Sequence, residues 1–88
     1  MISRDFIISN KLGLHARPSA RLTQTASRFA ADIHLWRNGR RVNAKSIMGV
    51  MMLAAGHGAT VTVEAEGDDA EQALAAIGQL IAEGFGEE

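Results

Sequence analysis

The sequence predicts a small domain of the α+β class, with strands and helices in the order β-α-β-β-α-β-α. Residues 32–37 and 60–66 alternate apolar and polar side chains, which is the period of a half-buried strand. Residues 16–28 and 70–81 carry apolar side chains at the spacing of an amphipathic helix. The Asn-Gly dipeptide that directly follows the first alternating segment is a strong signal for a two-residue hairpin.

Length and composition limit how these elements can be arranged. The chain has 88 residues, of which 47% are hydrophobic, so we expect one core and a single domain over residues 1–88. A four-stranded antiparallel sheet with three helices on one face, an open-faced β-sandwich, fits the element order. A ferredoxin-like domain shares the first six elements and fits the periodicity equally well.

The first strand is predicted over residues 3–9. Its alternation places Phe6 and Ile8 toward the core and Ile7 on the opposite face. Residues 10–14 then form a loop, in which a glycine permits an unusual backbone turn. We expect this loop to lead directly into the first helix.

The first helix is expected to begin near His15 or Ala16 and to run to about Arg28. Pro18 favours this start, because a proline in the first helical turn lacks only an N–H that would have no partner there. The residues expected at helical spacing on its apolar face are Leu22, Ala26, Phe29 and Ala30. The opposite, polar face is expected to be solvated.

The middle of the chain predicts a hairpin. Residues 32–37 form its first strand, Asn38-Gly39 forms its turn, and residues 40–43 return antiparallel. The side chains expected inward are Ile33 and Leu35, and those expected outward are His34 and Trp36. We interpret the outward pair as part of an uncovered sheet face rather than as a ligand-binding face.

Residues 46–53 predict a short helix that cannot be wholly buried. Ser46 is a good N-cap, but the residues after it are apolar almost all round. One stripe of this helix contains Ile47, Met48 and Met51, and the other contains Val50 and Leu53. A short surface helix can bury only one stripe, and an exposed stripe of isoleucine and methionine suits docking to changing partners. The alternative is that the whole segment belongs to the core.

The end of the chain predicts a turn, a strand and a helix. The turn covers residues 56–58 and the strand covers residues 60–66, with Val61, Val63 and Ala65 inward. Gly67-Asp68-Asp69 is expected to end the strand and to cap the last helix. The apolar face of that helix contains Ala70, Ala73, Leu74, Ile77, Leu80 and Ile81.

The charges are unevenly distributed along the chain. All nine basic residues lie at or before Lys45, whereas eight of the ten acidic residues lie after it. This predicts a basic surface near His15 that meets acidic partners, unless the fold interleaves the two halves and neutralises it. The residues expected to build this surface are Lys11, Arg17, Arg21, Arg28 and Lys45.

Composition excludes several classes of site. The chain has no cysteine and therefore no disulfide or zinc-thiolate site, and its three histidines lack the tight spacing of metal ligands. We expect neither a metal nor a cofactor. Arg4 and Asp5 interrupt the N-terminus at once, and no apolar run approaches the ~20 residues of a spanning helix. We therefore expect a cytoplasmic protein with no membrane insertion.

Function is expected at the start of the first helix. Free backbone N–H groups and the positive end of the helix dipole form an anion site there, and Arg17 adds a fork of donors suited to phosphate. The same field disfavours a charged imidazole, so we expect His15 to be neutral at ordinary pH and able to attack phosphorus. The alternative is that His15 only caps the helix or fills a corner.

Two runs of residues resemble a known family. The run from Asn10 to Ser19 and the run from Lys45 to Met51 are similar to the two signature segments of HPr, the histidine-containing phosphocarrier family of the bacterial phosphoenolpyruvate-dependent phosphotransferase system. The resemblance spans nearly all of the chain. It implies the open-faced β-sandwich as the fold.

The resemblance also implies a phosphoryl relay rather than an enzyme with its own turnover. Phosphoenolpyruvate phosphorylates enzyme I, which passes the group to Nδ1 of His15, and His15 passes it to a histidine of an enzyme IIA-type acceptor. Arg17 resembles the residue that coordinates the phosphate, and Ser46 resembles the regulatory serine phosphorylated by an HPr kinase/phosphorylase. The partner-binding face that the resemblance and the charge pattern imply contains Lys11, Ala16, Arg21, Lys45, Ile47, Met48 and Met51. The carrier is expected to be a monomer that serves sugar transport, a nitrogen-related pathway or regulation.

Two other classes of function remain open at this point. A nucleic-acid-binding module would use Arg37, Arg40 and Arg41 with Trp36 on the uncovered sheet face, although one tryptophan is a poor stacking platform and the second half of the chain is acidic. A small hydrolase of the acylphosphatase kind shares part of the topology. His15 alone with its neighbouring arginine provides no group that activates water.

Overall fold

The computed structural model describes residues 1–87 and contains four strands and three α-helices in the predicted order. The strands are β1 (Ile2–Ile7), β2 (Asp32–Arg37), β3 (Arg40–Asn43) and β4 (Thr60–Glu66), and the helices are α1 (Ala16–Ala26), α2 (Ile47–Met52) and α3 (Ala70–Ala82). A short 3-10 turn, η1 (Gly84–Gly86), follows α3. The α+β class predicted from the sequence is therefore confirmed.

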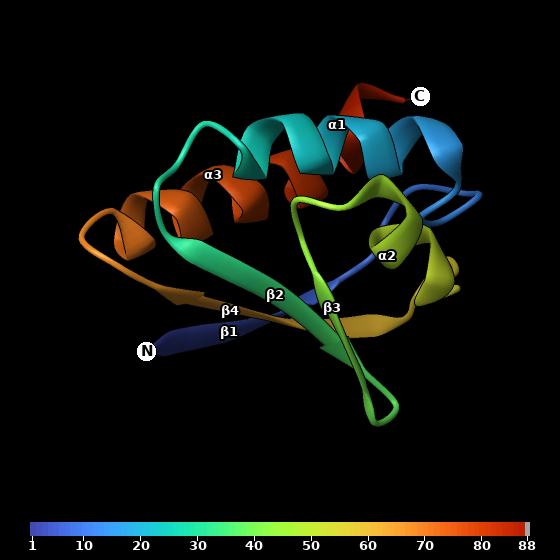
Figure 1. Cartoon of the computed structure of the whole chain (residues 1–88). Helices are drawn as coiled ribbons and strands as arrows, with labels where there is room; N and C mark the ends of the chain where they lie inside the picture. Colours follow the sequence, from blue (N-terminus) through green and yellow to red (C-terminus); the bar gives the residue numbers. More distant parts are fainter. Residues whose placement is uncertain (88) are drawn as a thin grey trace.

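All four strands belong to one antiparallel sheet in the order β1-β4-β2-β3. The three helices lie on one face of this sheet and the other face is bare, so the open-faced β-sandwich is the observed arrangement (Figure 1). Strand alternation produces it, because every second side chain of the central strands points to the helices. The buried members of this set are Ile33, Leu35, Val61, Val63 and Ala65. On the bare face Trp36 is 42% exposed, as the alternation predicts.

The predicted hairpin joins β2 to the edge strand β3. Asn38 and Gly39 both have positive φ, at 51° and 78°, which is the backbone of a type I′ turn. Asparagine and glycine tolerate this conformation better than other residues. The turn fixes the register in which Leu35 lies opposite Val42.

The helix α1 ends at Ala26, two residues earlier than its pattern predicts. Phe29 and Ala30, which were expected on its apolar face, lie beyond the end of the helix. Phe29 is half-buried and Ala30 is exposed. The chain turns here because the N–H groups of Ala30 and Ala31 are bound from outside, at 2.8 and 2.9 Å, by the Asp69 carboxylate.

The role of Asp69 is therefore not the predicted one. Asp69 stands at the N-cap position of α3 but makes no capping hydrogen bond with its side chain. Each of its carboxylate oxygens accepts a hydrogen bond from a backbone N–H in the turn before β2, and these two donors would otherwise lack partners. The carboxylate thus joins the end of α1 to the start of α3. Within residues 1–87, none of the helices has the length and apolar character needed to cross a membrane.

We predict that Asp69→Ala lowers the free energy of unfolding by about 1–3 kcal/mol, because two backbone N–H groups, the exposed one of Ala30 and the half-buried one of Ala31, lose a charged acceptor. Asp68→Ala is the matched control, since Asp68 is exposed and its change should cost less than about 0.5 kcal/mol. Urea unfolding of the two variants measures the difference. Equal losses would contradict the bridging role of Asp69.

Candidate functional site

A short loop after β1 carries His15 to the start of α1, and backbone contacts fix its path. Gly13 has a φ of +70°, a left-handed conformation that glycine adopts without strain. Leu14 then donates its N–H to the carbonyl of Ala55, at 2.9 Å, in the segment between α2 and β4. A Cβ at Gly13 would lie 2.6 Å from the Cα of Gly56, so the close approach of these two segments requires glycine.

Two buried polar side chains hold the same loop from within. The Asn10 amide donates to the carbonyl of Gly13 at 2.8 Å, and the Ser19 hydroxyl donates to the carbonyl of Leu14 at 3.1 Å. His15 is left as the residue before α1, with extended backbone, and its carbonyl accepts the N–H of Ser19 at 3.0 Å. The start of the helix is therefore where the sequence predicts it.

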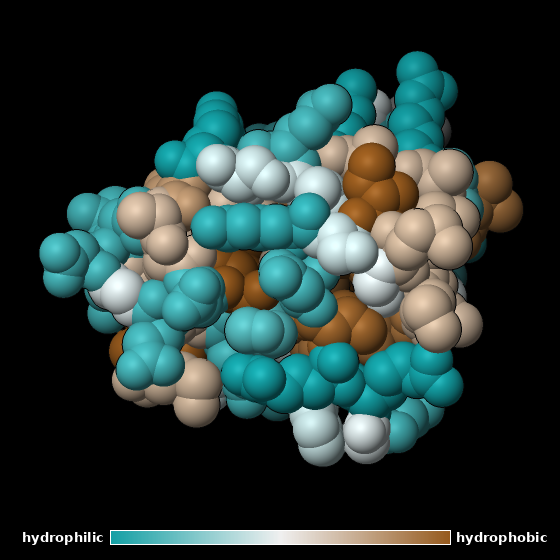
Figure 2. All heavy atoms as spheres, viewed as in Figure 1, coloured by the Kyte–Doolittle hydropathy of each residue, from teal (hydrophilic) through white to brown (hydrophobic). Residues whose placement is uncertain are grey.

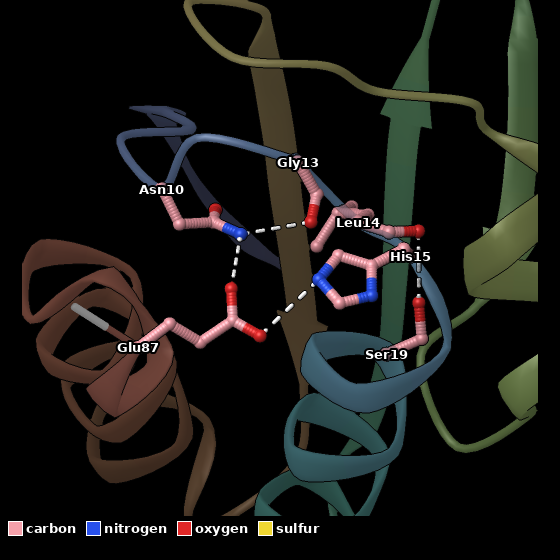
Figure 3. A network of polar contacts seen from close by, with 6 residues as sticks. All are labelled: Asn10, Gly13, Leu14, His15, Ser19 and Glu87. Carbon is pink, nitrogen blue, oxygen red and sulfur yellow. Dashed lines mark hydrogen bonds and ion pairs between the residues drawn. The ribbon is translucent and has the colours of Figure 1, made fainter.

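The His15 ring meets a carboxylate from the opposite end of the chain. Oε2 of Glu87 lies 3.2 Å from Nε2 of His15, and Oε1 of Glu87 accepts a hydrogen bond from the Asn10 amide at 3.0 Å (Figure 3). The side chains of His15 and Glu87 are 36% and 25% exposed. Sequence reasoning missed Glu87, because it follows the last helix in a short glycine and glutamate run that carries no signal of where it packs.

The two ring nitrogens of His15 have different surroundings. Nε2 is buried and makes no hydrogen bond within residues 1–87, but it lies 3.2 Å from a carboxylate oxygen of Glu87, close enough for an ion pair. Nδ1 lies on the other side of the ring, points away from Glu87 and makes no capping hydrogen bond to α1 (Figure 3). The ring therefore offers Nδ1, rather than Nε2, to an incoming group.

A hollow of about 810 Å³ opens beside His15. The loop after β1, the first turns of α1 and the segment around η1 form its walls, and the charged or titratable side chains in them are Lys11, His15, Arg17, Arg21 and Glu87. None of the three cations forms an ion pair within residues 1–87. Three free cations around one carboxylate make the hollow suitable for an anion.

The predicted basic surface is only partly assembled. Arg28 lines a separate, smaller pocket that it shares with Arg21, between α1 and α3. Lys45 does not join the hollow: its ammonium donates to the carbonyl of Phe29 at 2.8 Å, in the turn after α1. Lys45 therefore does not line this hollow, because a backbone carbonyl beyond the far end of α1 binds its ammonium group.

Elsewhere the fold interleaves the basic and acidic halves of the chain. Arg41 pairs with Glu64 at 3.0 Å across the bare sheet face, and Arg4 lies 3.5 Å from Glu71. Arg37 donates to a backbone carbonyl at 3.1 Å. These contacts occupy cations on which a nucleic-acid-binding sheet face would depend, whereas the hollow keeps its positive charge.

The helix α2 begins and packs as its sequence predicts. The Ser46 hydroxyl accepts the N–H of Gly49 at 3.1 Å, so Ser46 is the N-cap. Val50 and Leu53 are buried, at 0% and 4% exposure. The other stripe, which we call the Ile/Met patch, is exposed and contains Ile47 (44%), Met48 (69%) and Met51 (37%).

The Ile/Met patch lies next to α1. The two helices pack together, and apolar side chains gather over α2 at the right of the space-filling view (Figure 2). Met52, which the sequence left unassigned, is 57% exposed and extends the apolar surface. The alternative that the whole segment is core is therefore wrong.

Comparisons with known proteins agree with this geometry. Residues 2–83 match a family model described as "PTS HPr component phosphorylation site". The "Phosphocarrier protein HPr" of Cupriavidus necator is 60% identical over 99% of this chain and 98% of its own length, and that of Xylella fastidiosa is 47% identical over 100% and 99%. A crystal structure of HPr from Thermoanaerobacter tengcongensis superposes with a TM-score of 0.96 at 49% identity, covering 100% of this chain and 99% of that one.

We predict that Gly13→Ala destabilises the protein more than Gly58→Ala does. Both glycines have positive φ, at 70° and 86°, so both variants should lose roughly 1–2 kcal/mol in the backbone. A Cβ at Gly58 meets nothing within 4 Å, whereas one at Gly13 meets backbone. We expect Gly13→Ala to lower the free energy of unfolding by about 1–3 kcal/mol more, because the loop must shift.

Urea unfolding measures the two costs, and amide exchange of Leu14 reports the loop directly. Faster exchange at Leu14 in Gly13→Ala alone is expected, since its hydrogen bond to Ala55 is then lengthened. The same loss of stability in both variants would contradict the close approach of the two segments.

Proposed function

The chain belongs to the HPr family of phosphocarrier proteins of the phosphotransferase system, and on that premise we propose that His15 is the residue that carries the phosphoryl group. The position of His15 carries this proposal: it stands directly before α1, half-exposed, with Nδ1 turned away from Glu87. Nδ1 is the attacking atom and the hollow receives the phosphoryl oxygens.

The start of α1 supplies the donors for those oxygens. The N–H groups of Ala16 and Arg17 belong to the first helical turn and have no intrahelical acceptor, and Pro18 has no N–H. The helix dipole favours negative charge at the same point. The Arg17 guanidinium, which lines the hollow, adds donors that match phosphate geometry.

The open form of the hollow suits a carrier that must give its phosphate away. Enzyme I is the donor and an enzyme IIA-type protein is the acceptor, and each transfer requires an in-line approach by a second phosphate-binding site. A half-exposed histidine with an arginine and a helix terminus leaves the far side of the phosphorus accessible. The protein is then a reactant recycled between enzymes in the cytoplasm and has no turnover of its own.

Partners dock on the face formed by α1 and α2. Lys11, Ala16 and Arg21 surround the start of α1, and the Ile/Met patch lies on the helix packed beside it. Acidic partners are attracted by the free cations, while methionine side chains adapt to surfaces of different shape. A monomer keeps this face open to successive partners.

Ser46 is the regulatory site of this proposal, modified by an HPr kinase/phosphorylase. Its hydroxyl caps α2 and the Ile/Met patch begins at the next residue. A phosphate there adds roughly −1.5 to −2 charge, which is favourable for the helix start but repels an acidic partner approaching α1 and α2.

We predict that the protein takes one acid-labile phosphate from phosphoenolpyruvate and enzyme I, and that His15→Ala takes none. Intact mass before and after acid treatment measures this. His34→Ala is the matched control and should be phosphorylated like the parent, because His34 lies on the bare sheet face. Phosphate on His15→Ala, or none on the parent, would contradict the proposal.

We also predict that Ser46→Asp slows phosphorylation of His15 by enzyme I by roughly three- to tenfold at low salt, because one added charge lies beside the docking face. Ser46→Asn is the control: asparagine caps a helix as well as serine does and adds no charge. Initial rates at two salt concentrations test this, since screening should shrink the difference. Equal rates for the Asp and Asn variants would contradict a charge effect.

A further inference from the structure

Glu87 contacts the reacting ring but has no part in the proposed function so far. We propose that Glu87 is a positioning residue that holds the proton of His15 on Nε2 and thereby leaves the lone pair of Nδ1 free for the phosphoryl group. This inference rests on the proposed function of His15, and it concerns a contact between the two ends of the chain.

The Glu87 carboxylate is held in place by a second contact. One oxygen of the Glu87 carboxylate lies 3.2 Å from Nε2 of His15, and the other accepts from the Asn10 amide at 3.0 Å (Figure 3). Asn10 is itself only 5% exposed and is held by its hydrogen bond to the Gly13 carbonyl at 2.8 Å. A buried amide therefore fixes the orientation of the carboxylate against the ring.

The chain before Glu87 is shaped to deliver it. Gly84, Phe85 and Gly86 all have positive φ, at 63°, 59° and 72°, so the segment turns sharply after α3. Phe85 adopts this conformation although it has a Cβ, and its ring is fully buried in the core. Burial of a phenyl ring compensates for the backbone strain and anchors the segment two residues before Glu87.

The Glu87 carboxylate can assist both phosphoryl transfer to His15 and transfer from His15 to the acceptor. As Nδ1 of His15 forms its bond to phosphorus, the bond between phosphorus and the donor atom of phosphorylated enzyme I breaks, and the donor atom keeps the electron pair of that bond. His15 keeps its own proton on Nε2, so its ring becomes cationic, and the carboxylate opposite that proton stabilises the charge. When His15 passes the phosphoryl group to the acceptor, its ring leaves as a neutral imidazole, because the proton on Nε2 stays in place.

The other charged groups around the ring do not substitute for Glu87. Lys11, Arg17 and Arg21 are the cations that line the hollow, and they attract the phosphoryl oxygens. Glu87 faces the nitrogen on the opposite side of the ring from Nδ1. Its negative charge therefore acts on the proton of the ring while the cations act on the phosphate.

The test measures the His15 tautomer and the transfer rate in the same set of full-length proteins. Imidazole nitrogen NMR in alkaline solution, where the ring carries one proton, distinguishes Nε2–H from Nδ1–H. We expect the parent to hold Nε2–H, Glu87→Ala to raise the Nδ1–H to Nε2–H ratio about threefold or more, and Glu71→Ala to resemble the parent. Glu71 is the matched control because its carboxylate is exposed at the other end of α3.

Steady-state phosphorylation by enzyme I supplies the second readout. Glu87→Gln keeps the shape of the side chain and removes its charge, and it should lower kcat/KM by about three- to tenfold, with most of the change in kcat. Amide spectra check that each variant is folded.

Each outcome decides the proposal. Nδ1–H as the main form of the parent, or a tautomer ratio unchanged in Glu87→Ala, would overturn it, and so would a shifted ratio with an unchanged kcat in both Glu87 variants. If the parent takes no phosphate from enzyme I, the proposed function fails, while the tautomer comparison still shows whether Glu87 holds the proton.

Discussion

Leu14 donates its backbone N–H to Ala55, and this hydrogen bond joins the loop before α1 to the segment that follows α2. The bond is possible only because Gly13 has no Cβ, so that two backbones approach within the space that a methyl group would fill. The position of His15 relative to α2 depends on it. His15, the start of α1 and the exposed Ile/Met patch, which carry the proposed function, are thereby brought together from elements that are separate in the sequence.

The geometry of the His15 site fits the proposed role of a transient phosphoryl carrier. A deep, closed pocket would bind phosphate tightly and exclude a second protein, whereas this hollow is open and its histidine is 36% exposed. Three cations and a single carboxylate line this hollow, so its net charge is positive. On the bare sheet face, by contrast, ion pairs such as that of Arg41 with Glu64 neutralise the surface. The three cations that line the hollow beside His15 form no ion pair within residues 1–87, and we propose that acidic partners bind there.

Most of the fold could be predicted from the sequence because its signals act over short distances. Alternation within a strand, the Asn38-Gly39 turn and the Ser46 cap each depend on residues fewer than five positions apart. The predictions differ from the structure where a residue distant in the sequence binds a segment whose local pattern favours another conformation. The helical spacing of α1 continued past Ala26, but the Asp69 carboxylate binds the backbone that follows and ends the helix there.

The sequence by itself determined the reacting side chain of the proposed site, since His15 and Arg17 stand at a helix start that Pro18 marks locally. Only the tertiary structure decided what surrounds the ring. Lys45 was expected near it and binds the far end of α1, while Glu87 was not expected and contacts Nε2. The physical reason is that a charged side chain binds whichever complementary group the packing of the core brings within reach, and that packing depends on the whole chain.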